Sequence, residues 1–249
     1  GMLLVGAGFT PTTTTVETGV YQHVFKLSTR SAHKWLTVLS KLGDRTRRAS
    51  DVRINSLTID ANTRGVSWTA GLLGITTDDA PGSETGTEEA LVKILPSTGS
   101  LTIMDGATEI VNTATDSLLG ISLNIANPLD DADQSLFAFT RADLPQQGMD
   151  ITGQITGLEL DYTTYYDLLV YGGGSSPAAS VAVLDINYKW ESAVEITSGN
   201  PYSLEIDIPA AEVTLNDFNA DGNNIVRWDF AYRMIDNSTD PIAITLIND

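Results

Sequence analysis

Alternating apolar and polar residues predict β-strands over much of the chain. In residues 202–208, YSLEIDI, apolar side chains occupy every second position and Ser, Glu and Asp take the positions between them. Residues 226–234 repeat this alternation, with one face formed by Val226, Trp228, Phe230, Tyr232 and Met234. The segment ITLI, residues 244–247, predicts a last short strand. Each of these strands is expected to bury one face.

Turn signals connect these strands into hairpins. Residues 52–71 predict a strand through Ile59, a polar turn over 60–65, and a second strand with Val66, Trp68 and Ala70 on one face. Residues 101–111 predict another hairpin, in which Asp105 and Gly106 supply the turn. Asp221 and Gly222 are a third turn signal, between strands 211–215 and 225–230.

Two segments carry helical spacing. In residues 161–174, a Tyr-rich stripe recurs at helical intervals and three glycines end the pattern, which predicts one helix. The stripe fits an amphipathic core face better than a sugar-stacking surface. Residues 33–43, HKWLTVLSKLG, fit either a helix or a strand, because their apolar spacing is helical while their residue types favour strands.

Together these elements predict a mainly β fold, an antiparallel β-sandwich or partly closed barrel with one flanking α-helix. We expect a single domain over residues 20–249. Residues 2–19 are predicted to form a flexible N-terminal arm, since the Thr-rich sequence has few apolar groups to bury. This arm should be poorly ordered in an isolated subunit and gain order in an assembly.

The composition excludes several kinds of chemical site. The 249 residues include no cysteine, which excludes disulfides, thiolate metal sites and a cysteine nucleophile, and they include two histidines, His23 and His33. No apolar run approaches the roughly 18 residues of a membrane-spanning helix. The sequence contains no nucleophile elbow, phosphate-binding loop or zinc-protease motif, so we expect a protein that is not an enzyme and needs no cofactor.

The net charge of −18 argues against nucleic-acid binding, which depends on Lys and Arg side chains. The charge is also unevenly distributed. Residues 1–64 hold nine bases and four acids, a net charge of +5, whereas residues 65–249 hold five bases and 28 acids, a net charge of −23. Such a division favours self-association between unlike surfaces.

One stretch resembles half of a calcium-binding loop. Asp217, Asn219 and Asp221 are spaced two apart and precede a glycine, as in that loop. The twelfth position, which should be a bidentate carboxylate, is Trp228, and strands are predicted where helices should flank the loop. These three residues are therefore weak metal candidates, and the stretch is interpreted as a hairpin turn.

Residues 51–74, DVRINSLTIDANTRGVSWTAGLLG, are similar to a hairpin signature of the tail tube proteins of long-tailed bacteriophages and prophages. The C-terminal third resembles the same family through YSLEIDIPAAEV, a turn, and a closing strand that ends in ITLIND. The resemblance runs from about Val20 to the end of the chain.

This resemblance implies a virion structural protein that assembles into hexameric rings. The rings would stack into a tube through which DNA passes without specific binding. Partners would be further copies and other phage tail proteins, and the protein would be made in the bacterial host cytoplasm and reside in the virion tail. The resemblance also implies that residues 35–39 form a strand paired with residues 54–59. It transfers no catalytic residue.

An alternative remains, a carbohydrate-binding or adhesin-type β-sandwich module, because an acidic, cysteine-free sandwich with exposed aromatic residues suits that class too. Under the tail tube interpretation, the densest basic cluster supplies candidate inter-subunit contacts. Arg45, Arg47 and Arg48 are predicted to lie in a polar turn between two strands, from which they would reach an acidic loop of the next subunit.

Overall fold

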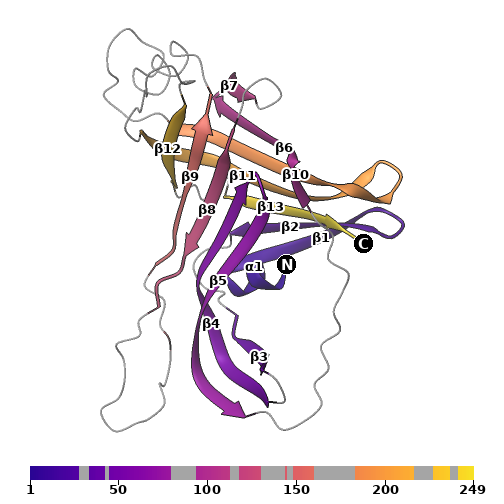
Figure 1. The fold of residues 1–249 in the computed structure, drawn as a ribbon, viewed down its shortest axis with the longest axis vertical. Helices are drawn as coiled ribbons and strands as arrows, with labels where there is room; N and C mark the ends of the chain where they lie inside the picture. The colour runs from indigo at the N-terminus through magenta and orange to yellow at the C-terminus, as the bar shows by residue number, and fades with distance from the viewer. Residues whose placement is uncertain are drawn as a thin grey trace.

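The computed structural model describes residues 1–27, 34–42, 45–79, 94–112, 118–129, 144, 148–159, 183–215, 227–235 and 241–249. These residues form thirteen strands, all paired antiparallel, and one short helix (Figure 1). The predicted mainly β, antiparallel fold is therefore confirmed, and the sheet is not closed into a barrel. The elements are α1 (Met2–Gly6), β1 (Phe9–Glu17), β2 (Val20–Leu27), β3 (Leu36–Leu42), β4 (Arg45–Asn62), β5 (Gly65–Asp79), β6 (Ile94–Asp105), β7 (Thr108–Asn112), β8 (Gly120–Ala126), β9 (Asp150–Leu158), β10 (Val183–Thr197), β11 (Asn200–Leu215), β12 (Trp228–Met234) and β13 (Ala243–Asn248).

The strands form two layers that face a common core. The first layer has the order β7-β6-β10-β11-β13-β2-β1, and the second has the order β12-β9-β8-β4-β5. In Figure 1 the strands of the second layer cross the direction of β10 and β11. Apolar residues alternate along β8, β9, β10 and β12, so each strand contributes a buried row to one cluster.

Strand β11 joins the two layers. It pairs with β10 along most of its length, while its other edge pairs first with β13 at Ser203–Asp207 and then with β12 at Ala211–Leu215. The change of partner falls at Pro209, where the β10–β11 register also shifts. Because proline has no N–H to donate, this position suits a bend where the ladder is interrupted.

A buried tyrosine pair connects the layers through the core. The Tyr188 hydroxyl of β10 lies 2.7 Å from the Tyr232 hydroxyl of β12, and Tyr232 donates to the backbone oxygen of Ser122 on β8 at 3.0 Å. Tyr232 reaches β8 by crossing β9 at Gly153, where a Cβ atom would collide with the Tyr232 ring and the Ser122 carbonyl. Glycine is therefore required at position 153 by a close approach.

The N-terminal segment contributes to the core. Leu4 and Ala7 are fully buried, and α1 packs so closely that a Cβ on Gly6 would lie 2.8 Å from side-chain atoms of Ile54 and Leu36. The Asn127 side chain donates to the Ala7 carbonyl at 3.3 Å. From Thr10 to Glu17, in contrast, every side chain of β1 is exposed. Whether residues 2–19 behave as an arm distinct from the domain, and are poorly ordered in an isolated subunit, stays a prediction.

Several local predictions can be compared with the structure. The hairpins β4–β5 and β6–β7 and the final strand β13 are confirmed. Residues 36–42 form a strand, but β3 pairs with the Arg45–Val52 part of β4 and not with residues 54–59. The connection between β3 and β4 is short, so adjacent residues pair, and β8 takes the edge of β4 from Ser56 onward. The predicted helix over 161–174 lies outside the described residues.

The described residues contain no helix with the length and apolar character that crossing a membrane requires.

The Gly153→Ala substitution should destabilise the fold, because the new methyl group would displace Tyr232 from its contact with Ser122. Overpacking of this kind typically lowers the free energy of unfolding by about 1–3 kcal/mol. Urea denaturation of both proteins measures the effect. Gly148→Ala is the matched control, since a Cβ atom added at Gly148 would meet no other atom within 4 Å. Equal losses in the two variants would contradict this account of Gly153.

The tyrosine pair should make stability depend on alkaline pH. Burial raises the pKa of both Tyr188 and Tyr232, and the neighbouring Tyr232 raises that of Tyr188 further. Above about pH 10 the unfolded chain ionises these phenols while the folded chain keeps them neutral, so the free energy of unfolding should fall as pH rises. Denaturation curves between about pH 8 and pH 11 should show this fall. In the double variant Tyr188→Phe, Tyr232→Phe the slope should be smaller, and an unchanged slope would contradict the assignment.

Candidate functional site

The metal candidates Asp217, Asn219 and Asp221 lie outside the described residues, so the structure does not test them. Within the described ranges, no group of three or more His, Asp or Glu side chains is placed to hold a metal ion. The surface features of the described residues are strand edges, hairpin ends and one outer face of the sheet.

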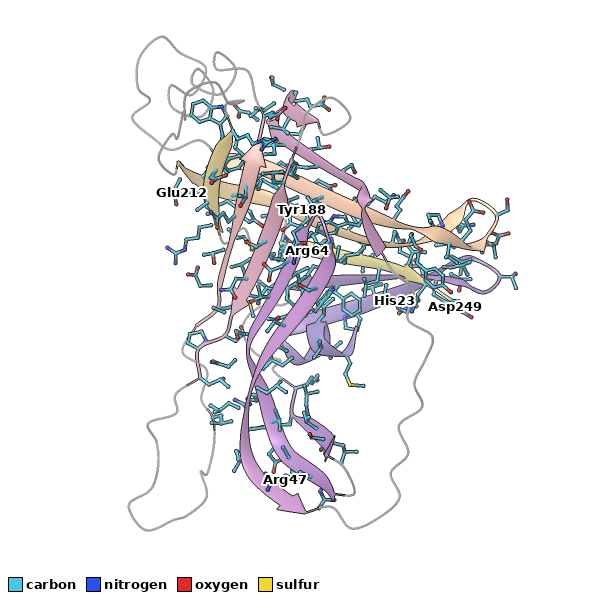
Figure 2. All side chains as sticks on the ribbon, in the orientation of Figure 1. His23, Arg47, Arg64, Tyr188, Glu212 and Asp249 are labelled. Carbon is cyan, nitrogen blue, oxygen red and sulfur yellow. The ribbon has the colours of Figure 1, made fainter. Side chains whose placement is uncertain are left out.

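The arginine cluster lies on a strand and not in a turn, which corrects the sequence prediction. Arg45, Arg47 and Arg48 belong to β4, because the β3–β4 ladder continues down to the pair of Leu42 with Arg45. Arg47 and Arg48 are exposed, and their backbone partners on β5 are Asp79 and Asp78. Figure 2 places Arg47 at the far end of the β3–β4–β5 ribbon from Arg64 at the β4–β5 turn. The acidic segment expected to belong to a neighbouring subunit thus begins beside these arginines in the same chain.

Four strands pair on one side only in the described part of the chain, β1, β3, β5 and β7, and the longest runs without a charged residue lie on β1 and β5. Strand β1 pairs only with β2, and β5 pairs only with β4. Neither edge carries the charges that usually prevent pairing, since residues 9–16 and 65–77 include no Asp, Glu, Lys or Arg. Long uncharged edges of this kind can accept a strand from another chain.

The inward row of β5 is apolar but incompletely covered. Val66, Trp68 and Ala70 lie opposite the buried Ala61, Ile59 and Leu57 of β4 and pack against the core. The next residue in this row, Leu72, is opposite the fully buried Ile54 yet remains 44% exposed. The apolar face of the second layer therefore continues to its open edge.

Two hairpin ends are tied together at one end of the first layer. The Glu17 carboxylate of the β1–β2 hairpin accepts hydrogen bonds from Thr197 at 3.0 Å and Asn200 at 2.8 Å, both in the β10–β11 hairpin. Gly19 and Gly199 have positive φ angles of 81° and 86°, which suits both tight turns. Although residues 17 and 200 are far apart in sequence, the two ends form one surface.

The outer side of the second layer carries short polar side chains, and we call it the polar face. Its residues alternate with buried ones along each strand and form cross-strand rows, such as Thr69, Thr58, Asn124, Thr152 and Arg233. The polar face consists of Ser56, Thr58, Asp60, Ser67, Thr69, Ser122, Asn124, Asp150, Thr152, Gln154, Thr156, Asp229, Ala231 and Arg233.

The polar face carries three acids, Asp60, Asp150 and Asp229, and one base, Arg233. Its one base, Arg233, forms an ion pair with Asp150 at 2.8 Å. Asp229 accepts a hydrogen bond from the Gly157 backbone at 2.7 Å. At the rim of the face, Arg227 pairs with Glu159 at 3.3 Å, and Arg64 lies at the β4–β5 turn.

Sequence reasoning missed two of these features. Strand β1 was hidden by the low apolar content of its Thr-rich sequence, although Thr favours strands and Thr18-Gly19 is a turn signal. The polar face could have been found in GISLNIA and DITGQIT, where Ser, Asn, Thr and Gln alternate with Ile and Leu.

Comparison with known proteins assigns the chain to a family. The family model described as phage tail tube protein matches residues 2–232, nearly the whole chain. No curated protein matches it. The β-rich antiparallel fold agrees with the resemblance carried by the sequence motifs. The chain belongs to the phage tail tube protein family, and it is a structural component of a phage tail.

Proposed function

We propose that this protein assembles into hexameric rings, which stack into a tube that conducts phage DNA. In this role it acts as a structural subunit and not as an enzyme, it binds no cofactor, and its partners are further copies and other tail proteins. It is made in the bacterial host cytoplasm and ends in the virion tail. Membership of the tail tube family supports a virion tail component that self-assembles.

The observation that carries this proposal is the pair of uncharged, unpaired edges, β1 in the first layer and β5 in the second, within the described part of the chain. The two edges differ in sequence and environment, so a contact between β1 of one copy and β5 of the next would be head to tail. Head-to-tail contacts generate closed rings when the rotation between copies closes. A strand added at β5 would also cover the half-exposed row that ends at Leu72.

The charge of the chain suits a conduit for DNA. At a net charge of −18 the protein repels phosphates at long range, so DNA can pass without being held.

Lysines on the β1 edge should block ring formation. In Thr12→Lys, Thr14→Lys, two exposed edge positions become charged, and charged edges resist pairing. We expect the melting temperature of the monomer to be unchanged. The protein concentration at which half of the subunits are assembled should rise at least about tenfold, which corresponds to a loss of about 1.4 kcal/mol of association free energy. Electron microscopy and light scattering of concentrated protein provide the measurement.

The control for this experiment is Thr245→Lys on β13, a strand that is paired on both sides. It adds the same side chain to the same layer without altering an edge and should assemble normally. A parent protein that stays monomeric at every concentration and binds a glycan would instead favour the carbohydrate-binding module.

A charge exchange tests whether the arginine cluster contacts the next subunit or pairs only within its own chain. Reversing Arg45, Arg47 and Arg48 to Glu places like charges opposite Asp78 and Asp79, and it should weaken assembly at low salt. Each exposed pair contributes at most ~1 kcal/mol, and the effect should shrink as salt screens charges beyond a Debye length of ~8 Å.

Adding Asp78→Arg and Asp79→Arg to the reversed variant restores opposite charges within the hairpin. If the arginines contact an acidic surface of the next subunit, this second change restores monomer stability but leaves assembly weak. Recovery of both properties would mean that the arginines act only within their own chain. Light scattering across a salt series, together with thermal melts, distinguishes these results.

A further inference from the structure

We propose that α1 is a latch that holds the β3–β4–β5 ribbon in one direction, and that the Asn127 side chain closes this latch. The latch would act within a single subunit, whether or not the proposed rings form. It gives a positioning role to the first residues of the chain, for which the sequence alone predicts a flexible arm.

The ribbon has an irregular root, which we define as residues 51–55 of β4 and the residues that pair with them. The register of β4 shifts against β3 between the partners of Leu36 and Val38, and against β5 between Ile54 and Ser56. Asp51 has a φ angle of 54°, and it is the one non-glycine residue with a positive φ in the described ranges. Bulges interrupt a ladder locally and bend the strand that carries them.

Strand β5 is also weakened at the root. Gly74 lies opposite Val52 and Gly71 lies opposite Ser56, so two glycines face the irregular part of β4. Glycine inside a strand has no side chain to pack and often marks a bend. The direction of the ribbon therefore depends on contacts that reach the root from outside it.

Helix α1 makes such a contact. Figure 1 shows α1 in the angle between the ribbon and strands β1 and β2. A Cβ atom added at Gly6 would lie 2.8 Å from side-chain atoms of both Ile54 on β4 and Leu36 on β3. At the other end of the helix, a Cβ atom added at Gly1 would lie 3.2 Å from the Phe25 ring of β2. The short helix thus connects the first layer to the root of the ribbon.

Asn127 joins the end of α1 to the same root. Its backbone N–H donates to the carbonyl of Asn55 at 2.7 Å, and its side chain donates to the carbonyl of Ala7 at 3.3 Å. Asn55 is the extra residue of the β4 bulge against β5. Ala7 follows the last residue of α1 and is fully buried, so its carbonyl needs a partner from within the protein.

The burial of Asn127 favours a specific role for its side chain. Asn127 is fully buried, and its Oδ1 accepts no hydrogen bond from the described residues. A buried polar atom of this kind lowers the stability of a fold, so an apolar side chain would be favoured here unless the Nδ2 donor were needed. The partner of that donor is α1.

Hydrogen exchange of the unassembled subunit tests the latch. Asn127→Leu removes the side-chain bond to Ala7, while the backbone bond to Asn55 needs no side chain. Amides of α1 and of ribbon residues 36–42, 45–54 and 72–79 should exchange at least about tenfold faster, because a buried carbonyl loses its donor. Amides of β10 and β11 should be unchanged. Gly6→Leu, which displaces α1 from Ile54 and Leu36, should give the same pattern.

Two controls separate the latch from a general loss of stability. Ile125→Val removes one methyl group from the buried row of β8 without touching α1, so any faster exchange should not be concentrated in the ribbon. Gly148→Leu adds the same side chain as Gly6→Leu where a new Cβ would meet no atom within 4 Å, and it should exchange like the parent. If one of the two latch variants does not fold, the other decides. Faster exchange in α1 alone, or equal acceleration throughout the subunit, overturns the inference.

Spin labels measure the direction of the ribbon itself, since the protein has no cysteine of its own. Leu39→Cys labels an exposed position of β3, and Ser198→Cys labels the β10–β11 turn. The distribution of distances between these two labels should broaden when Asn127→Leu or Gly6→Leu is added. A control pair within the first layer, Ser198→Cys with Glu109→Cys on β7, should keep its distribution. Unchanged distributions for both pairs in both latch variants would show that α1 does not set the direction of the ribbon.

Discussion

Strand β11 must satisfy backbone hydrogen bonds in two layers at once, and the arrangement of the core follows from this constraint. Its pairing with β10 is nearly continuous, while its other edge changes from β13 to β12 near Pro209. The crossing of the layers brings Tyr188 and Tyr232, which flank β11 on β10 and β12, into contact through their hydroxyls. The tyrosine contact therefore depends on the angle at which the layers cross, and Gly153 makes room for it.

A sheet that bends in this way but does not close leaves strands at its ends. The chain does not protect β1 and β5 with charges, although it has 46 charged residues to place. Charged residues do occur at the end of the β4–β5 ribbon, where Arg47 and Arg48 pair in register with Asp79 and Asp78. In the second layer, the open edge of β5 has no charged residue from Gly65 to Thr77.

Much of this fold was predictable because binary alternation in antiparallel strands is a local signal. YSLEIDI and VRWDFAYRM became β11 and β12, with Leu204, Ile206 and Phe230 buried as expected. The register of β3 was less accessible, because the part of β4 that pairs with β3 depends on where β8 ends. The arginine cluster was misplaced for a related reason: β-strands tolerate exposed charges at their ends, and a polar composition alone does not distinguish such an end from a turn. The unpaired edges of β1 and β5 could not be predicted from the sequence, because whether a strand edge is paired depends on the arrangement of the whole sheet.

The β3–β4–β5 ribbon extends past β8, and beyond Val52 it is three strands wide (Figure 1). A narrow antiparallel ribbon resists stretching along its strands, where backbone hydrogen bonds would have to shear together, but it bends and twists easily out of its plane. Elastic anisotropy of this kind has a consequence for any assembly that uses the ribbon as a connection. In such an assembly the ribbon would hold the distance between neighbouring subunits fixed and would let them tilt relative to one another.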